Sequence, residues 1–271
     1  MTDFWSTAEP VAGGDLLIRR APGAVMVSFN RPTKHNAFNA AVYDHLVRLC
    51  GDLRADASVR VVVFRGEGGA AFAAGNDIAT FEHLRDGWEG VSYERRVREV
   101  LDGVRHLPQV TVAEVNGVCV GGGLALANCC DLRIAASSAR FGYPIARTLG
   151  NALSTPVLQR CVHIFGESLT SEMLLASRLV DASRAHAAGA LMAVVDPVDL
   201  DDATVSIVTG IMQAAPLTLR VSKEQIRAVS GAEVPEQESQ LAEVYGSADF
   251  REGVRAFLAR EKPCFGSGSS G

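Results

Sequence analysis

The sequence lacks the features that mark several classes of protein. Its six cysteines form no C-x-x-C pair, and no two of its six histidines are four residues apart, so a metal site has no support. No apolar run reaches the roughly 18 residues that a membrane helix needs, and no basic segment precedes an apolar one at the N-terminus. A net charge of −5 without a basic stripe argues against general binding to nucleic acid or membrane surfaces. We therefore expect a soluble, cytoplasmic protein with free thiols and no metal.

The overall amino-acid composition is ordinary for a globular protein. With 271 residues, of which 48% are hydrophobic and 21% charged, the chain can form one large α/β domain or one domain with an appendage. Apolar segments at Leu16–Arg20 and Ala24–Asn30 flank an Ala-Pro-Gly turn and predict a β-hairpin. Asn39 can cap a helix whose apolar face consists of Val42, Leu46, Leu49 and Leu53.

Continuous apolar runs alternate with helical segments along the middle of the chain. VRVVVFRG (59–66) and VTVAEV (110–115) are typical of strands buried on both faces, and DLRIAA (131–136) predicts another strand. A helical stretch, Val91 to His106, lies between the first two runs, and a short helix lies between the second and third. This alternation predicts β-α-β units and a mostly parallel sheet.

The chain becomes helical in pattern after about residue 200. We expect an α/β core over residues 1–200, a helical oligomerisation subdomain over 201–265, and a flexible tail over 266–271, which contains only glycine and serine. The helical segments carry more apolar side chains than a lone appendage normally leaves in water, which predicts that a second copy covers them. These side chains include Leu217, Leu219, Val221, Ile226 and Val229.

Two glycine-containing segments carry the candidate chemistry. AAFAAGNDIATF (70–81) follows the strand at 59–66, and EVNGVCVGGGLALANCCDL (114–132), which includes three consecutive glycines, follows the strand at 110–115. Open α/β sheets place ligand crevices at such turns, and two free backbone N–H groups that converge there form an oxyanion hole. The alternative is that Gly121–Gly123 only permit tight packing of a helix against a strand.

Four motifs in this order resemble those of the crotonase (enoyl-CoA hydratase/isomerase) superfamily. FNRPTKHNAFN (29–39) resembles the N-R-P-x-x-x-N-A segment of that family, and FAAGNDI (72–78) its F-x-A-G-x-D-[LI] turn. VNGVCVGGGLALANCCDLRIA (115–135) resembles the N-G-x-x-x-G-G-G segment, and FREGVRAFLAREKPCF (250–265) the C-terminal helix. The resemblance extends over nearly the whole chain.

The resemblance implies a spiral of β-β-α units with a helical C-terminal trimerisation region, assembled as a homotrimer or a dimer of trimers. It also implies that the backbone N–H groups of Asn76 and Gly122 hold the thioester carbonyl of an acyl-CoA substrate, with no cofactor beyond the coenzyme A moiety. The positions that the resemblance assigns to substrate or coenzyme A binding are Lys34, Ala74, Asp77, Ile78, Gly121, Ile145, Phe257 and Lys262.

The sequence departs from the family pattern at both acid/base positions. Hydratases of this family carry one glutamate three residues after the middle glycine and a second directly after F-G-x-P. Here the first position is Ala125, and the second is Ile145, or Ala146 if the loop carries a one-residue insertion. None of these side chains transfers a proton. We therefore expect an enzyme that is not a standard hydratase.

Other polar residues are candidates for the missing roles. Arg147 can hold a substrate carboxylate or support an enolate, or it can form a structural ion pair. Asp77 is either a helix cap or, with Glu82 and His83, the nearest titratable group by sequence. Glu114 lies inside an apolar run, where it is either a buried partner of an arginine or a base with a raised pKa.

Together these observations predict an acyl-CoA enzyme that stabilises a thioester enolate. The reaction classes compatible with this chemistry are isomerisation, decarboxylation, C–C bond cleavage and thioester hydrolysis. The alternative is a non-catalytic acyl-CoA-binding or scaffold subunit.

Overall fold

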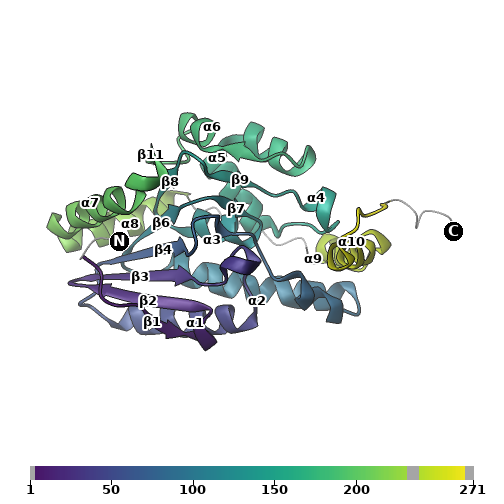
Figure 1. Ribbon diagram of the computed structural model, residues 1–271, viewed down its shortest axis with the longest axis horizontal. Coiled ribbons are helices and arrows are strands. Elements are labelled where there is room, and N and C mark those ends of the chain that lie inside the picture. Colours follow the sequence, from purple (N-terminus) through teal and green to yellow (C-terminus); the bar gives the residue numbers. More distant parts are fainter. Residues whose placement is uncertain (1–3, 231–237, 266–271) are drawn as a thin grey trace.

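Two β-sheets surrounded by helices form the core of the protein (Figure 1). The computed structural model describes residues 4–230 and 238–265. The larger sheet contains, in spatial order, β1 (Glu9–Val11), β2 (Leu16–Ala21), β3 (Ala24–Phe29), β4 (Val61–Gly66), β6 (Val110–Val115), β8 (Leu132–Ala136) and β11 (Ala193–Val195). The smaller sheet contains β10 (Val180–Asp181), β9 (Arg140–Gly142), β7 (Val118–Val120) and β5 (Ala71–Ala73).

The chain repeats a β-β-α unit, which confirms the predicted spiral. In each unit the first strand joins the larger sheet and the second joins the smaller one. The units are β4-β5-α2, with α2 at Gly87–Arg105, then β6-β7-α3, with α3 at Gly122–Cys129, and then β8-β9 followed by α4 (Ile145–Thr148) and α5 (Thr155–Leu175). Equivalent strands of successive units pair in parallel, so the segments that follow them leave each sheet at the same edge.

Most of the secondary structure predicted for the first 110 residues is confirmed. Strands β2 and β3 form the expected antiparallel hairpin. The side chain of Asn39 accepts a hydrogen bond from the Val42 N–H (2.9 Å) and caps α1 (Ala40–Ala55). The prediction that the next helix begins at Val91 is wrong: α2 begins at Gly87, because the Asp86 side chain accepts a hydrogen bond from the Glu89 N–H (2.9 Å) and starts the helix one turn earlier.

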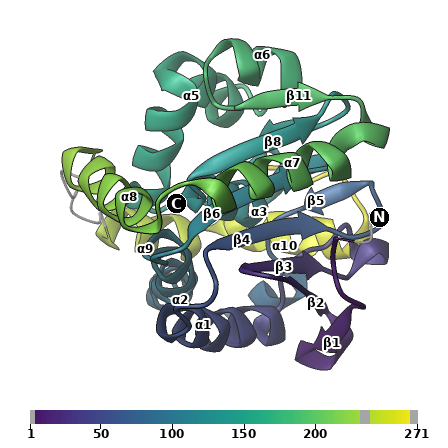
Figure 2. The same cartoon turned by 90° about the vertical axis from the view of Figure 1, so that its left-hand side faces the viewer.

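Helices cover both faces of the larger sheet. One apolar cluster fills the space between the two sheets and helices α1, α2 and α3. A second lies on the opposite face under α7 (Leu200–Gln213), which runs along that face in Figure 2. The region after residue 200 is helical as predicted, with α8 (Pro216–Ser230), α9 (Glu238–Tyr245) and α10 (Ala248–Ala259). The predicted tail at 266–271 lies outside the described residues, and the boundary at residue 200 stays a prediction.

The shorter elements connect these layers. They are the 3₁₀ helices η1 (Ala12–Gly14), η2 (Pro32–Lys34), η3 (Ile78–His83) and η4 (Pro197–Asp199), together with α6 (Ala182–Ala187). A third apolar cluster joins η3 to α9 and α10. The C-terminal helices therefore pack beside the turn that follows β5.

No single helix of residues 4–230 and 238–265 is long and apolar enough to cross a membrane; one pair, Pro197–Gln213 with Pro216–Ser230, passes that test only when combined, across a bend of 105°. The six cysteines, all of them described, are not joined by disulfides, and five of them are buried. Within the same described residues no group of histidine, cysteine and acidic side chains is arranged to hold a metal.

Candidate functional site

The two glycine-containing turns meet at one edge of the smaller sheet. One turn follows β5 and the other follows β7, and these strands are parallel neighbours. A Cβ placed on Gly75 would lie 3.4 Å from the backbone nitrogen of Gly122 and 3.5 Å from the Cα of Gly121. Gly75 and Gly121 also have positive φ angles, of 94° and 53°. Both positions therefore need glycine, for their backbone conformation and for the close approach of the two turns.

The sequence alone placed these turns directly after the long strands at 59–66 and 110–115. The structure corrects this, because each long strand is followed by a three-residue strand of the second sheet, and the turns follow these short strands. The two turns still meet, because β5 and β7 pair in parallel in the same way as β4 and β6.

Backbone geometry distinguishes the roles of the three glycines. A Cβ on Gly123 would lie 2.3 Å from the carbonyl oxygen of Ala73, so this glycine serves the tight packing of α3 against β5. Gly122 is the first residue of α3, where backbone N–H groups have no partner within the helix. The packing alternative is therefore correct for Gly123, while the N–H of Gly122 is available at the helix start as a candidate hydrogen-bond donor.

The turn that contains Asn76 is fixed on both sides. The Phe38 N–H donates to the carbonyl oxygen of Gly75 (2.8 Å), and the Asp77 N–H donates to the carbonyl oxygen of Phe38 (2.7 Å). Asp77 also forms an ion pair with Arg31 (2.9 Å), and its side chain accepts a hydrogen bond from the Ala79 N–H at the start of η3. The capping interpretation of Asp77 is therefore the one that the structure supports.

A tyrosine from α1 reaches the junction of the two turns. The hydroxyl of Tyr43 donates a hydrogen bond to Oδ1 of Asn76 (2.5 Å). It also lies 3.3 Å from the position that a Cβ on Gly122 would occupy, and Oδ1 of Asn76 lies 2.5 Å from that position. Burial raises the pKa of Tyr43 far above its usual value of 10, and the negative charge of Glu94 raises it further. Tyr43 is therefore a neutral hydrogen-bond donor at the site.

Further polar side chains continue from Tyr43 toward the C-terminal helices. The Tyr245 hydroxyl, from α9, donates a hydrogen bond to Oε1 of Glu94 on α2. Nδ2 of Asn151 approaches the same hydroxyl at 3.5 Å. Burial raises the pKa of Tyr245 well above its usual value, and the charge of Glu94 adds to this effect. Glu94, Asn151 and Tyr245 thus form a hydrogen-bonded polar cluster, and the charge of its carboxylate also acts on Tyr43.

Sequence reasoning missed Tyr43, Glu94 and Tyr245. Tyr43 is adjacent to Val42 on the buried face of a predicted helix, where a tyrosine is usually a core residue. Glu94 and Tyr245 come from helices that are distant from α1 in sequence. Only Tyr43 could have been found from the sequence. It stands among apolar residues that predict burial, and a buried hydroxyl needs a hydrogen-bond partner.

The two positions that the motif resemblance assigns to glutamates of hydratases are buried and apolar. Ala125 is 5% exposed and Ile145 is 8% exposed, and both belong to the same apolar cluster as Tyr43. The N–H of Gly121 donates to the carbonyl oxygen of Gly142 (3.1 Å), which ties the turn to β9 and to the segment leading to Ile145. Nothing at either position accepts or donates a proton.

The other predicted binding residues are dispersed around this edge. Ile78 is buried beside Phe81 and Tyr245 in the third apolar cluster, and the Ala74 N–H donates to the carbonyl oxygen of His35. Exposed positions hold Lys34 at the end of η2, Glu82 and His83 in η3, Ala146 and Arg147 in α4, Phe257 in α10 and Lys262 beyond it. The structure thus brings Asn76, Gly121 and Gly122 together, while the lysines, Arg147 and Phe257 lie on separate surface elements.

Glu114 lies on the other face of the larger sheet. It alternates along β6 with Ala113 and Val115, which pack in the cluster between the sheets, and it is fully buried beside Arg65 at 3.2 Å. Arg65 also contacts Asp201 of α7 at 2.7 Å. Burial raises the pKa of Glu114 to about 7 despite the opposing effect of Arg65. Glu114 is thus the buried partner of an arginine and lies away from the turns.

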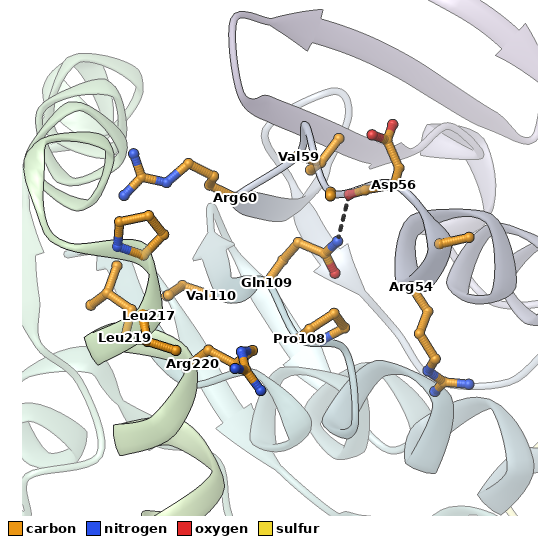
Figure 3. A pocket seen from close by; sticks show the side chains of 13 residues that line it. Arg54, Asp56, Val59, Arg60, Pro108, Gln109, Val110, Leu217, Leu219 and Arg220 are labelled. Carbon is orange, nitrogen blue, oxygen red and sulfur yellow. Dashed lines mark hydrogen bonds between the residues drawn. The ribbon is translucent and has the colours of Figure 1, made fainter.

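Two hollows lie at the opposite, amino-terminal ends of the parallel strands. One, of about 450 Å³, is shown in Figure 3, with Gln109 between Asp56 and the side chains of Leu217 and Arg220. The other, of about 780 Å³, lies between α5 and α8 and is lined by Arg105, Arg133, Arg160, Lys223 and Arg227. Ligand sites of open α/β sheets lie at the carboxyl ends of the strands, so these hollows do not coincide with the turns.

Comparisons with known proteins agree with the motifs. The family model for enoyl-CoA hydratase/isomerase matches residues 19–268. A putative enoyl-CoA hydratase of Thermus thermophilus is 32% identical over 257 residues, which are 92% of this chain and 100% of the relative. A crystal structure of an enoyl-CoA hydratase/carnithine racemase from Magnetospirillum magneticum is 34% identical, with a TM-score of 0.77 and 97% of each chain covered. A methylmalonyl-CoA decarboxylase in complex with 2-nitronate-propionyl-CoA is 27% identical, with a TM-score of 0.84, covering 92% of this chain and 97% of that one.

Proposed function

The chain belongs to the enoyl-CoA hydratase/isomerase family, and we propose that it binds an acyl-CoA thioester and stabilises the enolate formed from it. The observation that carries this proposal is the meeting of the Asn76 turn with the first residue of α3, Gly122. The thioester oxygen would lie between the two backbone N–H groups. Negative charge develops on that oxygen as the enolate forms, and fixed donors aimed at it stabilise the transition state.

The reaction that we propose is not the addition of water to a double bond. The two positions that carry glutamates in hydratases of the family hold Ala125 and Ile145, whose side chains are apolar and buried. A relative named methylmalonyl-CoA decarboxylase, 29% identical over 248 residues, supports a wider choice of reactions on coenzyme A esters. Isomerisation, decarboxylation, C–C bond cleavage and hydrolysis each proceed through a stabilised enolate or oxyanion, so they fit the site.

The coenzyme A moiety would extend from the turns across the surface. We assign Lys34 and Lys262 to its phosphates and Phe257 to its adenine end, because all three are exposed and able to reach a ligand. Arg147 would hold a carboxylate of the acyl group if the substrate carries one. Ala74, Asp77, Ile78, Gly121 and Ile145 would form the wall around the thioester, with Asp77 acting through its ion pair with Arg31. No cofactor besides the coenzyme A moiety is part of the proposal.

We also propose that the protein assembles through its C-terminal helices as a trimer or a dimer of trimers. Along α8, Leu217, Ile226 and Val229 are 63%, 66% and 89% exposed. Such an apolar surface is usually covered by another protein surface. In an assembly with closed rotational symmetry, a neighbouring copy covers this surface in every subunit.

The test is a panel of acyl-CoA thioesters incubated with the protein in deuterated water and followed by mass spectrometry. The proposal predicts a new product, or incorporation of deuterium at the α-carbon, for at least one thioester. Binding of thioesters without exchange or turnover would instead identify a non-catalytic acyl-CoA-binding subunit.

A further inference from the structure

A basic hollow lies at the amino-terminal ends of the parallel strands, away from the two turns. It is the hollow of about 780 Å³ between α5 and α8, and cationic side chains from four elements line it. Among the described residues, Asp131 is the single carboxylate in this lining. The hollow therefore carries a large excess of positive charge. Its cations are Arg105 of α2, Arg133 of β8, Arg160 of α5, and Lys223 and Arg227 of α8.

Two of these arginines meet at the end of α3. Arg160 donates a hydrogen bond to the carbonyl oxygen of Asn128 (3.0 Å), and Arg133 donates to that of Cys130 (2.7 Å). Because the two carbonyl groups are two residues apart in the chain, the two guanidinium groups lie close together. Burial lowers the pKa of Arg133, and the charge of Arg160 adds to this effect. The end of a helix carries about half a negative charge, which does not balance two cations.

Helix α8 and the end of α2 bring the other cations to the same place. The Lys223 ammonium forms an ion pair with the carboxylate of Asp131, which directly follows the end of α3, so these two charges cancel. One turn later on α8, Arg227 donates to the carbonyl oxygen of Leu107 (2.9 Å). Leu107 is two residues after Arg105, the last residue of α2. Four arginines therefore line the hollow without a carboxylate of their own in it.

The four arginines differ in how much of their hydrogen-bonding capacity the fold uses. Arg133 donates to four backbone carbonyl groups and is a structural residue. The Nε atoms of Arg105 and Arg160, in contrast, are buried and have no hydrogen-bond partner among the described residues. A buried donor without a partner is costly, and native proteins usually satisfy it. Arg105, Arg160 and Arg227 thus have both charge and donors left for a ligand.

We propose that this hollow binds a phosphate-bearing anion, with Arg105, Arg160 and Arg227 as its ligands. Guanidinium groups bind phosphate through pairs of parallel N–H donors. These three come from three different helices, which suits a tetrahedral phosphate with oxygens in several directions better than a planar carboxylate. Ile164 and Leu219 also line the hollow and would contact an organic group attached to the phosphate. The site is separate from the two turns, and the inference does not rest on the proposed function.

The test is calorimetric titration of the full chain, in the assembly state in which it is purified, with pyrophosphate and with ADP. We expect saturable binding, weakened by about 10–100-fold in Arg105→Gln and in Arg160→Gln, because each loses charged hydrogen bonds to the anion. Tighter binding of ADP than of pyrophosphate would support an organic phosphate as the ligand, and the reverse order would support an inorganic one.

Melting temperatures separate binding from a structural role. Arg105→Gln leaves the contacts at the end of α3 intact, so without phosphate it should melt no lower than the wild type. Pyrophosphate should raise the melting temperature of the wild type more than that of this variant, since a ligand stabilises the state that binds it. A variant that melts lower than the wild type and binds pyrophosphate equally well would assign Arg105 to the fold alone and overturn the proposal.

Matched controls test where the anion binds. Arg48→Gln removes an exposed arginine of α1, and Lys34→Gln removes a cation from the surface proposed for coenzyme A. Both should bind pyrophosphate as the wild type does. No binding by the wild type, or equal weakening in the controls, would overturn the proposal. No binding together with a lower mass of Arg105→Gln in light scattering would show that a second copy fills the hollow, which also overturns it. None of these outcomes bears on the thioester panel, which tests the proposed function separately.

Discussion

The hydroxyl of Tyr43 on α1 lies 2.5 Å from Oδ1 of Asn76, so a helix outside the smaller sheet holds the side chain of the turn that follows β5. This contact separates two properties of Asn76. Its backbone N–H would stabilise the thioester oxygen, whereas its side chain is a partner of Tyr43. The two properties can be tested independently, because a substitution changes the side chain alone.

Asn76→Ala should keep α-proton exchange within about tenfold of the wild type. The substitution removes the partner of Tyr43 but leaves the backbone donor, and loss of a catalytic donor typically costs 10²–10³-fold in rate. Exchange rates from mass spectrometry, compared with the melting temperature of each protein, check this. A loss greater than about a hundredfold in a folded variant would show that the amide side chain itself takes part in the reaction.

Hydration of crotonyl-CoA should be very slow. General acid–base groups contribute about 10²–10⁴-fold each, and the resemblance of the motifs places the apolar side chains of Ala125 and Ile145 where hydratases carry such groups. Loss of absorbance of the conjugated thioester measures the rate, with a two-glutamate hydratase of the family as the reference. Turnover within about tenfold of that reference would mean that the acid and base have been assigned to the wrong positions.

Stability should depend on pH through Glu114. Its pKa rises from 4.5 to about 7 on folding, so between these values the folded protein holds a proton that the unfolded chain has lost. The free energy of unfolding should therefore fall as pH rises through this window, by on the order of 3 kcal/mol relative to Glu114→Gln. Urea unfolding at pH 4.5, 6 and 8 measures the difference. Identical pH dependence of the wild type and Glu114→Gln would contradict the assignment.

A charge on the apolar face of α8 should dissociate the assembly. Ile226→Glu places a carboxylate at an exposed apolar position of α8, whereas Ala41→Glu places one at an exposed position of α1, outside the C-terminal helices. Light scattering after size exclusion should give three or six times 28.7 kDa for the wild type and Ala41→Glu, and a lower mass for Ile226→Glu. A wild-type mass near 28.7 kDa would refute the proposed trimer.

The elements that sequence predicted correctly are those with long or regular apolar patterns. The strands β3, β4 and β6 are buried on both faces, and α1 has a capping residue followed by a regular apolar face. The smaller sheet was missed, because β5, β7 and β9 have three residues each, too few to show a pattern of their own. The start of α2 was missed, because its cap at Asp86 precedes the apolar face by more than a turn.

The residues of the site also fall into those that stand in a local sequence motif and those that do not. Asn76 and Gly122 stand in local motifs whose glycines are required by backbone geometry, so sequence could bring them together. Tyr43, Glu94 and Tyr245 lie on three helices that meet only in the folded chain. Their sequence neighbours are typical of ordinary amphipathic helices, and no local pattern indicates that their polar atoms converge.

The central claim, that the Gly122 N–H stabilises the enolate oxygen, is tested most directly by α-proton exchange in Gly122→Pro beside Gly122→Ala. Both variants place a Cβ near Oδ1 of Asn76, but only proline removes the N–H, and the first position of a helix tolerates proline. The account predicts that Gly122→Pro exchanges at least about 10²-fold more slowly than Gly122→Ala while both stay folded. Equal exchange rates in the two folded variants would contradict it.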